Sequence, residues 1–169
     1  MDLSTIANLA TALTVLTAVG FGLLEMRRAR QEREERAAFA AVQAIMTPVW
    51  MKSIVIVQAI PEGAGAADIE ADPRVLEATH NIGITLEGLG YAVFARIVPL
   101  KVVDDLVGGT VRVSWRKMRR YIEYERQRAG SQKSWEWFQW LAEQLDRYSP
   151  GKTSLQVGAQ EAYRDWKPR

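Results

Sequence analysis

The first feature that constrains this chain is an uninterrupted apolar run near its N-terminus. Leu3 to Leu24 are 22 consecutive residues without a charged side chain. As an α-helix, with a rise of about 1.5 Å per residue, the run would be about 33 Å long, which matches the hydrocarbon thickness of a bilayer. Its Ser and Thr hydroxyls can bond to carbonyl groups of the same helix, so they are compatible with that environment. The run therefore predicts a transmembrane helix over residues 1–24.

Two other interpretations of the run are open. A cleaved signal peptide requires a basic segment before the apolar run, whereas Asp2 is the only charged side chain there. The dense basic residues that follow the run also disfavour translocation. The other alternative is a buried helix of a soluble domain, although an uncharged run of this length is uncommon in such helices.

Basic residues flank the apolar run on one side only. Five arginines follow within twelve residues of Leu24, and none precedes the run. Because cytoplasmic flanks of membrane helices are rich in Lys and Arg, we expect a single-pass protein of the inner (cytoplasmic) membrane with its N-terminus outside. Residues 25–36 lack Gly and Pro and are expected to continue the helix as a charged juxtamembrane segment. Its candidate contacts to anionic lipid are Arg27, Arg28, Arg30 and Arg33.

Small residues recur every four positions along the apolar run. A ridge of this kind lets a second helix approach closely, so it predicts self-association or docking on a larger membrane complex. Small residues are frequent throughout the run, and a ridge without a partner is the alternative. The ridge consists of Ala10, Thr14, Ala18 and Gly22.

Residues 37–149 are predicted to form a small cytoplasmic domain of helices only, followed by a loosely structured tail over residues 150–169. Pro48 indicates a kink or a new helix, and residues 49–60 are expected to be helical despite a strand-like composition. Residues 61–72 are expected to form a loop. Asp72 and Pro73 then begin a helix that runs to about Ile97.

Glycines and prolines divide the remainder of the domain. Gly83 and Gly90 lie one heptad apart inside a helix, which predicts a close crossing with a partner helix. Pro99 begins the next element, which Gly108 and Gly109 are expected to break. Further on, Gly130 is the expected end of a long polar helix. Ser131 or Ser134 is then expected to cap a final helix that ends near Tyr148.

The sequence offers little for catalysis, and we expect no enzyme, no cofactor and no metal. The chain has no cysteine and one histidine, His80. Glu77 and His80 match the Glu-x-x-His motif of di-iron bundles, but that site requires the motif on two helices. The segment Ser149–Ser154 resembles the end of a phosphate-binding loop and lacks the first glycine of that motif. Glu87 could serve as a general base only with a nucleophile that the sequence does not reveal, and a salt bridge to Arg96 or a partner helix is the preferred interpretation.

A second group of basic residues lies between two aromatic residues, Trp115 and Tyr121. A solvated helix face is the preferred interpretation, because Glu123 and Glu125 follow directly and can neutralise the positive charge. Contact with lipid headgroups is the next interpretation, and contact with protein or nucleic acid the last. The group consists of Arg116, Lys117, Arg119 and Arg120.

The aromatic residues of the C-terminal half carry a resemblance to a known family. The matching positions are Trp115, Tyr121-Ile122-Glu123, Arg126, Trp135, Phe138 and Trp140-Leu141-Ala142-Glu143. At these positions, and in the Gly-rich segment 83–94, the chain resembles a family of uncharacterised bacterial proteins. The resemblance implies one N-terminal transmembrane helix and a short all-helical cytoplasmic domain, a domain of unknown function with no assigned activity.

These observations predict a membrane-tethered interaction, scaffold or accessory subunit. Its partners would be membrane lipid and either a second copy or another protein, with no small-molecule substrate. Trp135 and Trp140, at the edges of the last helix, are the candidate partner surface, because Trp is favoured at interfaces. The alternative is a module that binds anionic lipid surfaces, or less favourably nucleic acid, through the basic groups. A cryptic hydrolase or metal enzyme is the least favoured interpretation.

Overall fold

The computed structural model describes residues 2–45, 47–148, 165 and 167. The described residues form six helices and no strand, which confirms the all-α fold class. Most of the tail over residues 150–169, including the segment that resembles a phosphate-binding loop, lies outside the described residues. The helices are α1 (Leu3–Ile45), α2 (Pro48–Ala59), α3 (Ala66–Glu70), α4 (Pro73–Phe94), α5 (Leu100–Ala129) and α6 (Glu136–Tyr148).

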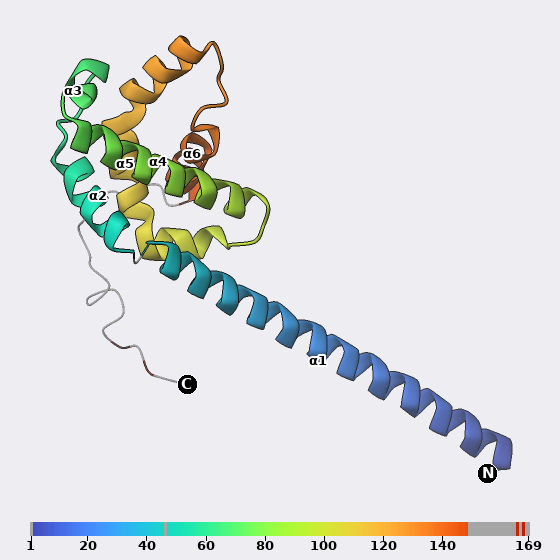
Figure 1. Ribbon diagram of the computed structural model, residues 1–169. Coiled ribbons are helices and arrows are strands. Elements are labelled where there is room, and N and C mark those ends of the chain that lie inside the picture. The colour runs from blue at the N-terminus through green and yellow to red at the C-terminus, as the bar shows by residue number, and fades with distance from the viewer. Residues whose placement is uncertain (1, 46, 149–164, 166, 168–169) are drawn as a thin grey trace.

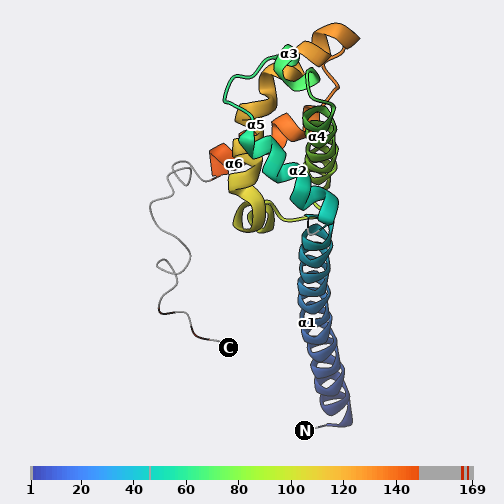
Figure 2. The same cartoon turned by 60° about the vertical axis from the view of Figure 1, so that its left-hand side comes forward.

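Helix α1 is a single rod that extends away from the other five helices (Figures 1 and 2). It contacts the domain chiefly through α4 and α5, and near its C-terminal end Ala37 is buried and Ile45 packs against the core. No helix end separates the apolar run from the charged segment 25–36 or from residues 37–45.

Among the described residues, none of the helices is both long and apolar enough to cross a membrane. The span that the sequence predicts over residues 1–24 is therefore not supported. The apolar run is the first part of a longer helix whose next turns are charged.

The domain is built around α4, against which α2, α3 and α6 pack, while α5 contacts α2 and α6 (Figure 1). Helices α2, α4, α5 and α6 contribute apolar stripes to one shared core, as expected of amphipathic helices in a small domain. Fully buried members from four helices include Val57, Ile82, Leu86, Met118, Ile122, Phe138 and Leu141.

Several helix ends follow the signals in the sequence. Helix α2 begins at Pro48, and the side chain of Thr47 accepts a hydrogen bond from the Trp50 backbone N–H at 3.1 Å. The side chain of Asp72 caps α4 by accepting from the Arg74 backbone N–H at 2.9 Å. Gly130 ends α5 in the left-handed region, with φ of 61°. These caps satisfy backbone groups that a helix cannot pair internally.

The structure corrects three of the expected boundaries. The segment 61–72, expected to be a loop, contains the short helix α3. At its start, the side chain of Asp68 accepts a hydrogen bond from the Gly65 backbone N–H at 2.8 Å. Helix α4 ends at Phe94, three residues before the expected end. Helix α5 continues through Gly108 and Gly109, because Gly108 is buried and leaves room for a neighbouring ion pair described below.

Candidate functional site

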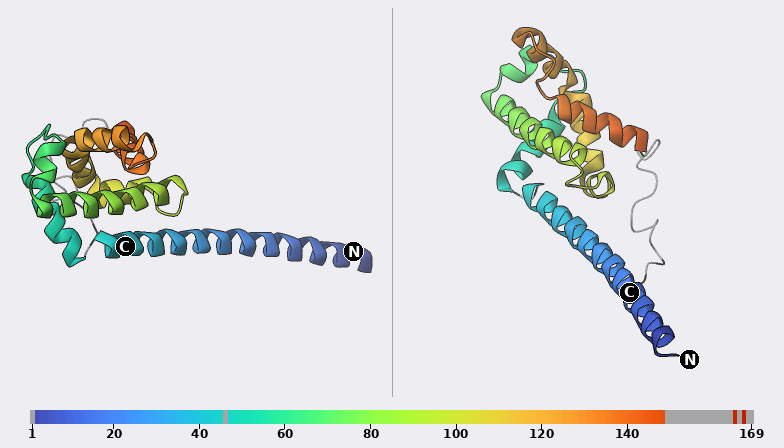
Figure 3. Two further views of the ribbon diagram at one scale, coloured as in Figure 1. Left: turned by 45° about the horizontal axis from the view of Figure 1, so that its top comes forward. Right: turned by 90° about the vertical axis from the view of Figure 1, so that its right-hand side faces the viewer.

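The apolar half of α1 exposes large side chains that nothing in the described domain covers. Figure 3 shows from two further sides that no other described helix lies beside this part of the rod. Eight large apolar side chains within 14 residues are each between 53% and 71% exposed. A contiguous exposed apolar surface of this kind is characteristic of contact with lipid or with another protein. These residues are Leu13, Val15, Leu16, Val19, Phe21, Leu23, Leu24 and Met26.

The small-residue ridge lies on this same exposed part of α1. Thr14, Ala18 and Gly22 are exposed, and a Cβ added at Gly22 would meet nothing within 4 Å. The side chain of Ala10 lies outside the described residues. The hydroxyl of Thr17, on the neighbouring face, donates to the Leu13 carbonyl at 2.8 Å and so is satisfied within the helix. No helix of the described domain packs against the ridge.

The turn between α4 and α5 has an unusual residue at its most constrained position. The N–H of Ile97 donates to the Ala92 carbonyl at 2.9 Å, and the N–H of Arg96 to the Val93 carbonyl at 3.0 Å. This pair of bonds defines a Schellman motif, whose left-handed residue is most often glycine. Here that residue is Arg96, with φ of 58°.

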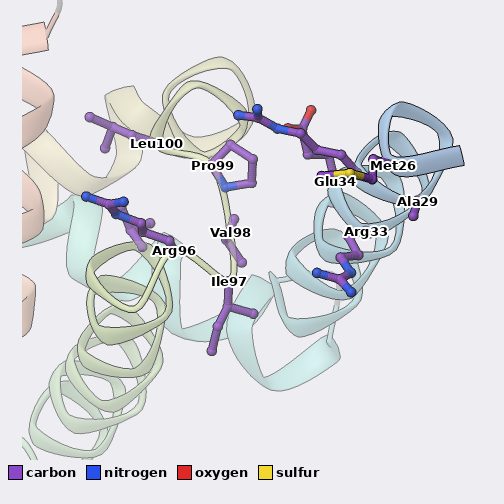
Figure 4. Close-up of a pocket in the computed structure, with 11 residues that line it drawn as sticks. Met26, Ala29, Arg33, Glu34, Arg96, Ile97, Val98, Pro99 and Leu100 are labelled. Atoms are coloured by element: carbon purple, nitrogen blue, oxygen red, sulfur yellow. The ribbon is translucent and has the colours of Figure 1, made fainter. Parts of the chain in front are cut away.

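A cleft of about 710 Å³ separates α1 from this turn (Figure 4). Side chains of α1 line one side, and residues from the end of α4 to the start of α5 line the other. The lining combines apolar side chains with three arginines and one acidic residue. Its members are Met26, Ala29, Arg30, Arg33, Glu34, Val93, Arg96, Ile97, Val98, Pro99 and Leu100.

The arginines of the cleft differ in how they are paired. Arg30 forms an ion pair with Glu34 at 3.3 Å, one helical turn away. The guanidinium groups of Arg33 and Arg96 make no hydrogen bond or ion pair with the described part of the chain. Arg27 and Arg28 are exposed on α1 and do not line the cleft. Among the described residues, neither Arg33 nor Arg96 has an ion-pair partner, and Figure 4 shows the Arg96 side chain pointing away from α1 and from Arg33.

The basic group on α5 is used largely inside the protein. Arg116 pairs with Glu62 at 3.3 Å, Lys117 donates to the Ile60 carbonyl, and Arg120 donates to the Gly63 carbonyl. Three of the four cations thus hold the segment 60–63 between α2 and α3 against α5. Arg119, the fourth, is exposed.

The glycines and tryptophans selected in the sequence lie together where α6 crosses α4. A Cβ at Gly83 would overlap the ring of Trp135, and a Cβ at Gly90 would overlap the backbone carbonyl of Trp137. Trp135 adopts φ of 61°, and Trp140 packs edge-on against Phe94 with ring centroids 5.8 Å apart. The segments that approach Gly83 and Gly90 closely belong to the same chain. Trp135 and Trp140 are both partly buried in it.

The residues considered for catalysis have structural partners. Glu87 accepts a hydrogen bond from the Phe138 backbone N–H of α6 at 2.8 Å, and no ion pair between Glu87 and Arg96 occurs in the described part of the chain. Glu87 also caps α6, a role expected of Ser131 or Ser134. His80 bonds to the Leu76 carbonyl at 2.9 Å and packs edge-on against Trp135. Within the described residues no cluster of three potential metal ligands occurs.

Two buried arginines have roles that sequence reasoning missed. Arg112 pairs with Asp104 and with Asp146, both at 3.0 Å, and donates to the Leu145 carbonyl at 2.7 Å. The spacing of Asp104, Gly108 and Arg112 at four-residue intervals was the available signal, since it puts opposite charges on one face with a gap between them.

Arg126 plays a similar part at the other end of α6. Its guanidinium donates to the carbonyls of Ser134 and Trp135 and to the side chain of Gln139. The contacts of Arg126, a residue of α5, therefore hold the turn before α6 in place.

Nothing in the sequence indicated that Arg96 would occupy a left-handed position in the cleft, because a left-handed Schellman residue is signalled by glycine.

Comparison with known proteins places most of the chain in one family. A family model described as a domain of unknown function (DUF4760) matches residues 5–145. The match covers all but the first two residues of the apolar run, the charged segment, α2 to α5, and α6 as far as Leu145. No curated protein matches the chain significantly, and neither does any solved structure.

Proposed function

Because the chain belongs to the DUF4760 family, whose description names no activity, we propose a function from its surfaces: a membrane-tethered interaction subunit without chemistry of its own. The apolar half of α1 would insert into the cytoplasmic membrane and the domain would lie on the cytoplasmic side. The observation that carries this proposal is the set of eight exposed apolar side chains between Leu13 and Met26. Burying such a side chain contributes roughly 1.5–3 kcal/mol, so together they favour removal from water strongly.

The arrangement of this surface supports association of helices. Counted at about 100° per residue, seven of the eight bulky residues lie outside the sector of the α1 circumference that the ridge occupies, and Phe21 lies within it. A second helix can approach the ridge while most of the bulky residues face lipid. Van der Waals packing at such small residues drives association where lipid already solvates the apolar side chains. We therefore infer self-association, or docking on another membrane protein, through Thr14, Ala18 and Gly22.

Membrane insertion is tested by expressing the full chain and extracting the host membranes at alkaline pH. We expect the chain to stay in the membrane pellet and to be released only by detergent. Release into the supernatant together with peripheral proteins would contradict the proposal. Protease protection of tags at the two ends checks the orientation, with the C-terminal tag accessible from the cytoplasmic side.

Association is tested separately in mild detergent, with variants matched in size. Gly22→Ile and Ala18→Ile add bulk on the ridge, whereas Gly20→Ile and Ala12→Ile add the same bulk off it. A Cβ at Gly20 or at Gly22 meets nothing within 4 Å, so the variants are expected to fold alike. We expect the ridge variants to disperse the assembly and the other two to preserve it. Equal behaviour of the two pairs would contradict a contact at the ridge.

A further inference from the structure

The α4–α5 turn is the end of the domain that lies nearest to the apolar half of α1. Helix α4 runs alongside α1 in the opposite chain direction, and its C-terminal end points toward the N-terminus of α1 (Figures 1, 2 and 3). Residues between Val93 and Leu100 line the cleft whose other wall is α1 between Met26 and Glu34. The turn is therefore level with the first turns of α1 after the apolar run, which ends at Leu24.

We propose that this turn, with the aromatic rings that pack beside it, rests on the lipid surface of the bilayer that α1 enters. The inference rests on the proposed function, because insertion of α1 brings the turn to that surface. At about 1.5 Å per residue, the cleft residues of α1 lie about 3–15 Å beyond the apolar run. The headgroup layer on each side of the hydrocarbon is about 5–7 Å thick, so the turn reaches it. The domain then has a second membrane contact besides α1.

Four aromatic rings form one contiguous cluster where the end of α4 lies beside α6. The ring centroid of Phe94 lies 4.4 Å from that of Trp137 and 5.8 Å from that of Trp140. The ring of Tyr91, one helical turn before Phe94, lies 5.7 Å from that of Trp137. Tyr91 and Phe94 are 52% and 53% exposed, and both tryptophans are partly exposed. Trp and Tyr are enriched where a membrane meets water, because each joins an apolar ring to a polar N–H or O–H group.

The sequence around the turn suits an anionic lipid surface. Residues 88–103 include no acidic side chain, and their two charged residues are Arg96 and Lys101. The four residues from Phe94 to Ile97 are all exposed, and Ile97 is 60% exposed. Aromatic, aliphatic and basic residues together are characteristic of segments that lie in the interfacial layer of a membrane.

Ile84 provides a matched reference on the same helix. Its side chain is 66% exposed, and it is as apolar as that of Ile97. It lies ten residues before Phe94, which places it about 15 Å back along α4 from the turn. A surface that meets lipid because of its level along α1 should include Ile97 and leave out Ile84.

The test uses the full chain, reconstituted into vesicles of phosphatidylcholine and phosphatidylglycerol. The chain has no cysteine, so Ile97→Cys and Ile84→Cys each provide a single site for an environment-sensitive fluorophore. Both side chains are exposed, so neither label has to displace the core. We expect lipids that carry a nitroxide on the upper acyl chain to quench most of the fluorescence at position 97 and little at position 84. Iodide, which quenches from the water phase, should show the reverse order.

The part played by the aromatic cluster is tested with Phe94→Ser in the chain labelled at position 97. Much of the lipid quenching should be lost, because an exposed ring no longer enters the interfacial layer. The control is Val55→Ser, which removes an apolar side chain of α2 that is 66% exposed and should leave the quenching unchanged. Circular dichroism checks that both variants keep their helices. Unchanged quenching in a folded Phe94→Ser chain would contradict the inference.

Two other results would overturn the lipid contact. Equal lipid quenching at positions 97 and 84 would mean that the turn is not singled out by its level along α1. Shielding of position 97 from both quenchers would mean that protein, such as a second copy of the chain, covers the turn.

A label at Leu16→Cys reports on the proposed function separately, because Leu16 lies in the apolar run and is 70% exposed. If lipid quenches position 16 and not position 97, α1 is inserted and only the contact at the turn is refuted. If lipid quenches position 97 and not position 16, insertion is refuted while the turn still meets the lipid surface. If lipid quenches neither position, both proposals fail.

Discussion

Glu87, in the middle of α4, accepts a hydrogen bond from the backbone N–H of Phe138 at 2.8 Å and so caps the start of α6 from 51 residues away. The first N–H groups of a helix have no partner inside it, and a carboxylate there also interacts favourably with the helix dipole. The cap fixes where α6 begins and holds it against the helix that it crosses. Because it is a contact between distant segments, no local pattern in the sequence reveals it.

Removal of this cap should destabilise the domain. We expect Glu87→Ala to lower the free energy of unfolding by about 1–2 kcal/mol and Glu87→Gln, which keeps an acceptor, by less. Urea unfolding of the full chain in mild detergent, followed by tryptophan fluorescence, measures the difference. Glu123→Ala, on an exposed face of α5, is the control and should stay within about 0.5 kcal/mol of the wild type. Equal effects at the two positions would contradict the capping role.

The glycines of α4 should respond to alanine according to what lies above them. Gly90→Ala would overlap the Trp137 carbonyl, and Gly83→Ala the Trp135 ring, so we expect losses of about 1–3 kcal/mol, larger at Gly90 because backbone cannot move aside. Gly88, in the same helix, has nothing within 4 Å, and Gly88→Ala should stabilise by about 0.5–1 kcal/mol. Thermal melts of the three variants should show opposite signs. Destabilisation by all three would indicate a general intolerance of α4.

The buried ion pair of Arg112 and Asp104, both with side chains at most 5% exposed, should show strong coupling. Arg112→Met alone leaves a buried carboxylate without its partner, so we expect a loss of about 3–5 kcal/mol. Adding Asp104→Leu should restore much of it, because the uncompensated charge is then gone. Arg116→Met is the control: its pair with Glu62 is exposed, and its loss should cost less than about 1 kcal/mol. A double variant no better than Arg112→Met would show that the pair acts independently.

Alkaline pH should weaken the domain through Tyr121. Burial, and then the charges of Glu125 and Glu70, raise the pKa of Tyr121 from 10.0 to about 12. The phenol therefore ionises first in the unfolded chain, so its contribution is fully present below about pH 10 and is lost as the pH rises toward 12. Tyr121→Phe should reduce the decline of unfolding free energy in this window by up to about 1.4 kcal/mol per pH unit. Urea unfolding at several pH values measures the slope, and an unchanged slope would contradict the assignment.

Local signals in the sequence predicted that the fold is helical and where many of the helices begin or end. The remaining helix boundaries depend on contacts between distant segments. Pro48, Asp72 and Gly130 act within a few residues of their own position, so their effects could be read from the sequence. Gly108 could not, because whether a glycine breaks a helix depends on what packs against it. There the Asp104–Arg112 pair occupies the space that a Cβ would fill. The short helix α3 was missed because five residues carry too little periodicity to be recognised.

In the candidate site, too, the features set by neighbouring residues could be predicted, and those set by contacts between distant segments could not. The apolar run and its arginines are contiguous, so the sequence could identify them. The cleft forms where α1 lies beside the α4–α5 turn, so its lining combines residues from segments that are distant in the sequence. On α5, charge alone indicated a solvated helix face or a surface for phosphate, while the structure uses Arg116, Lys117 and Arg120 to hold the segment 60–63. A run of basic residues in the sequence predicts positive charge, but it does not reveal which carbonyl groups of the same chain accept hydrogen bonds from those residues.

The continuity of α1 has a mechanical consequence. Its 43 residues form a rod about 64 Å long, without proline and without glycine after Gly22. Gly22, Met26 and Ala29 follow one another along one face, so the ridge and the cleft wall share a single rotational phase. A helix that packs on the ridge would therefore contact the same face of α1 that forms the wall of the cleft.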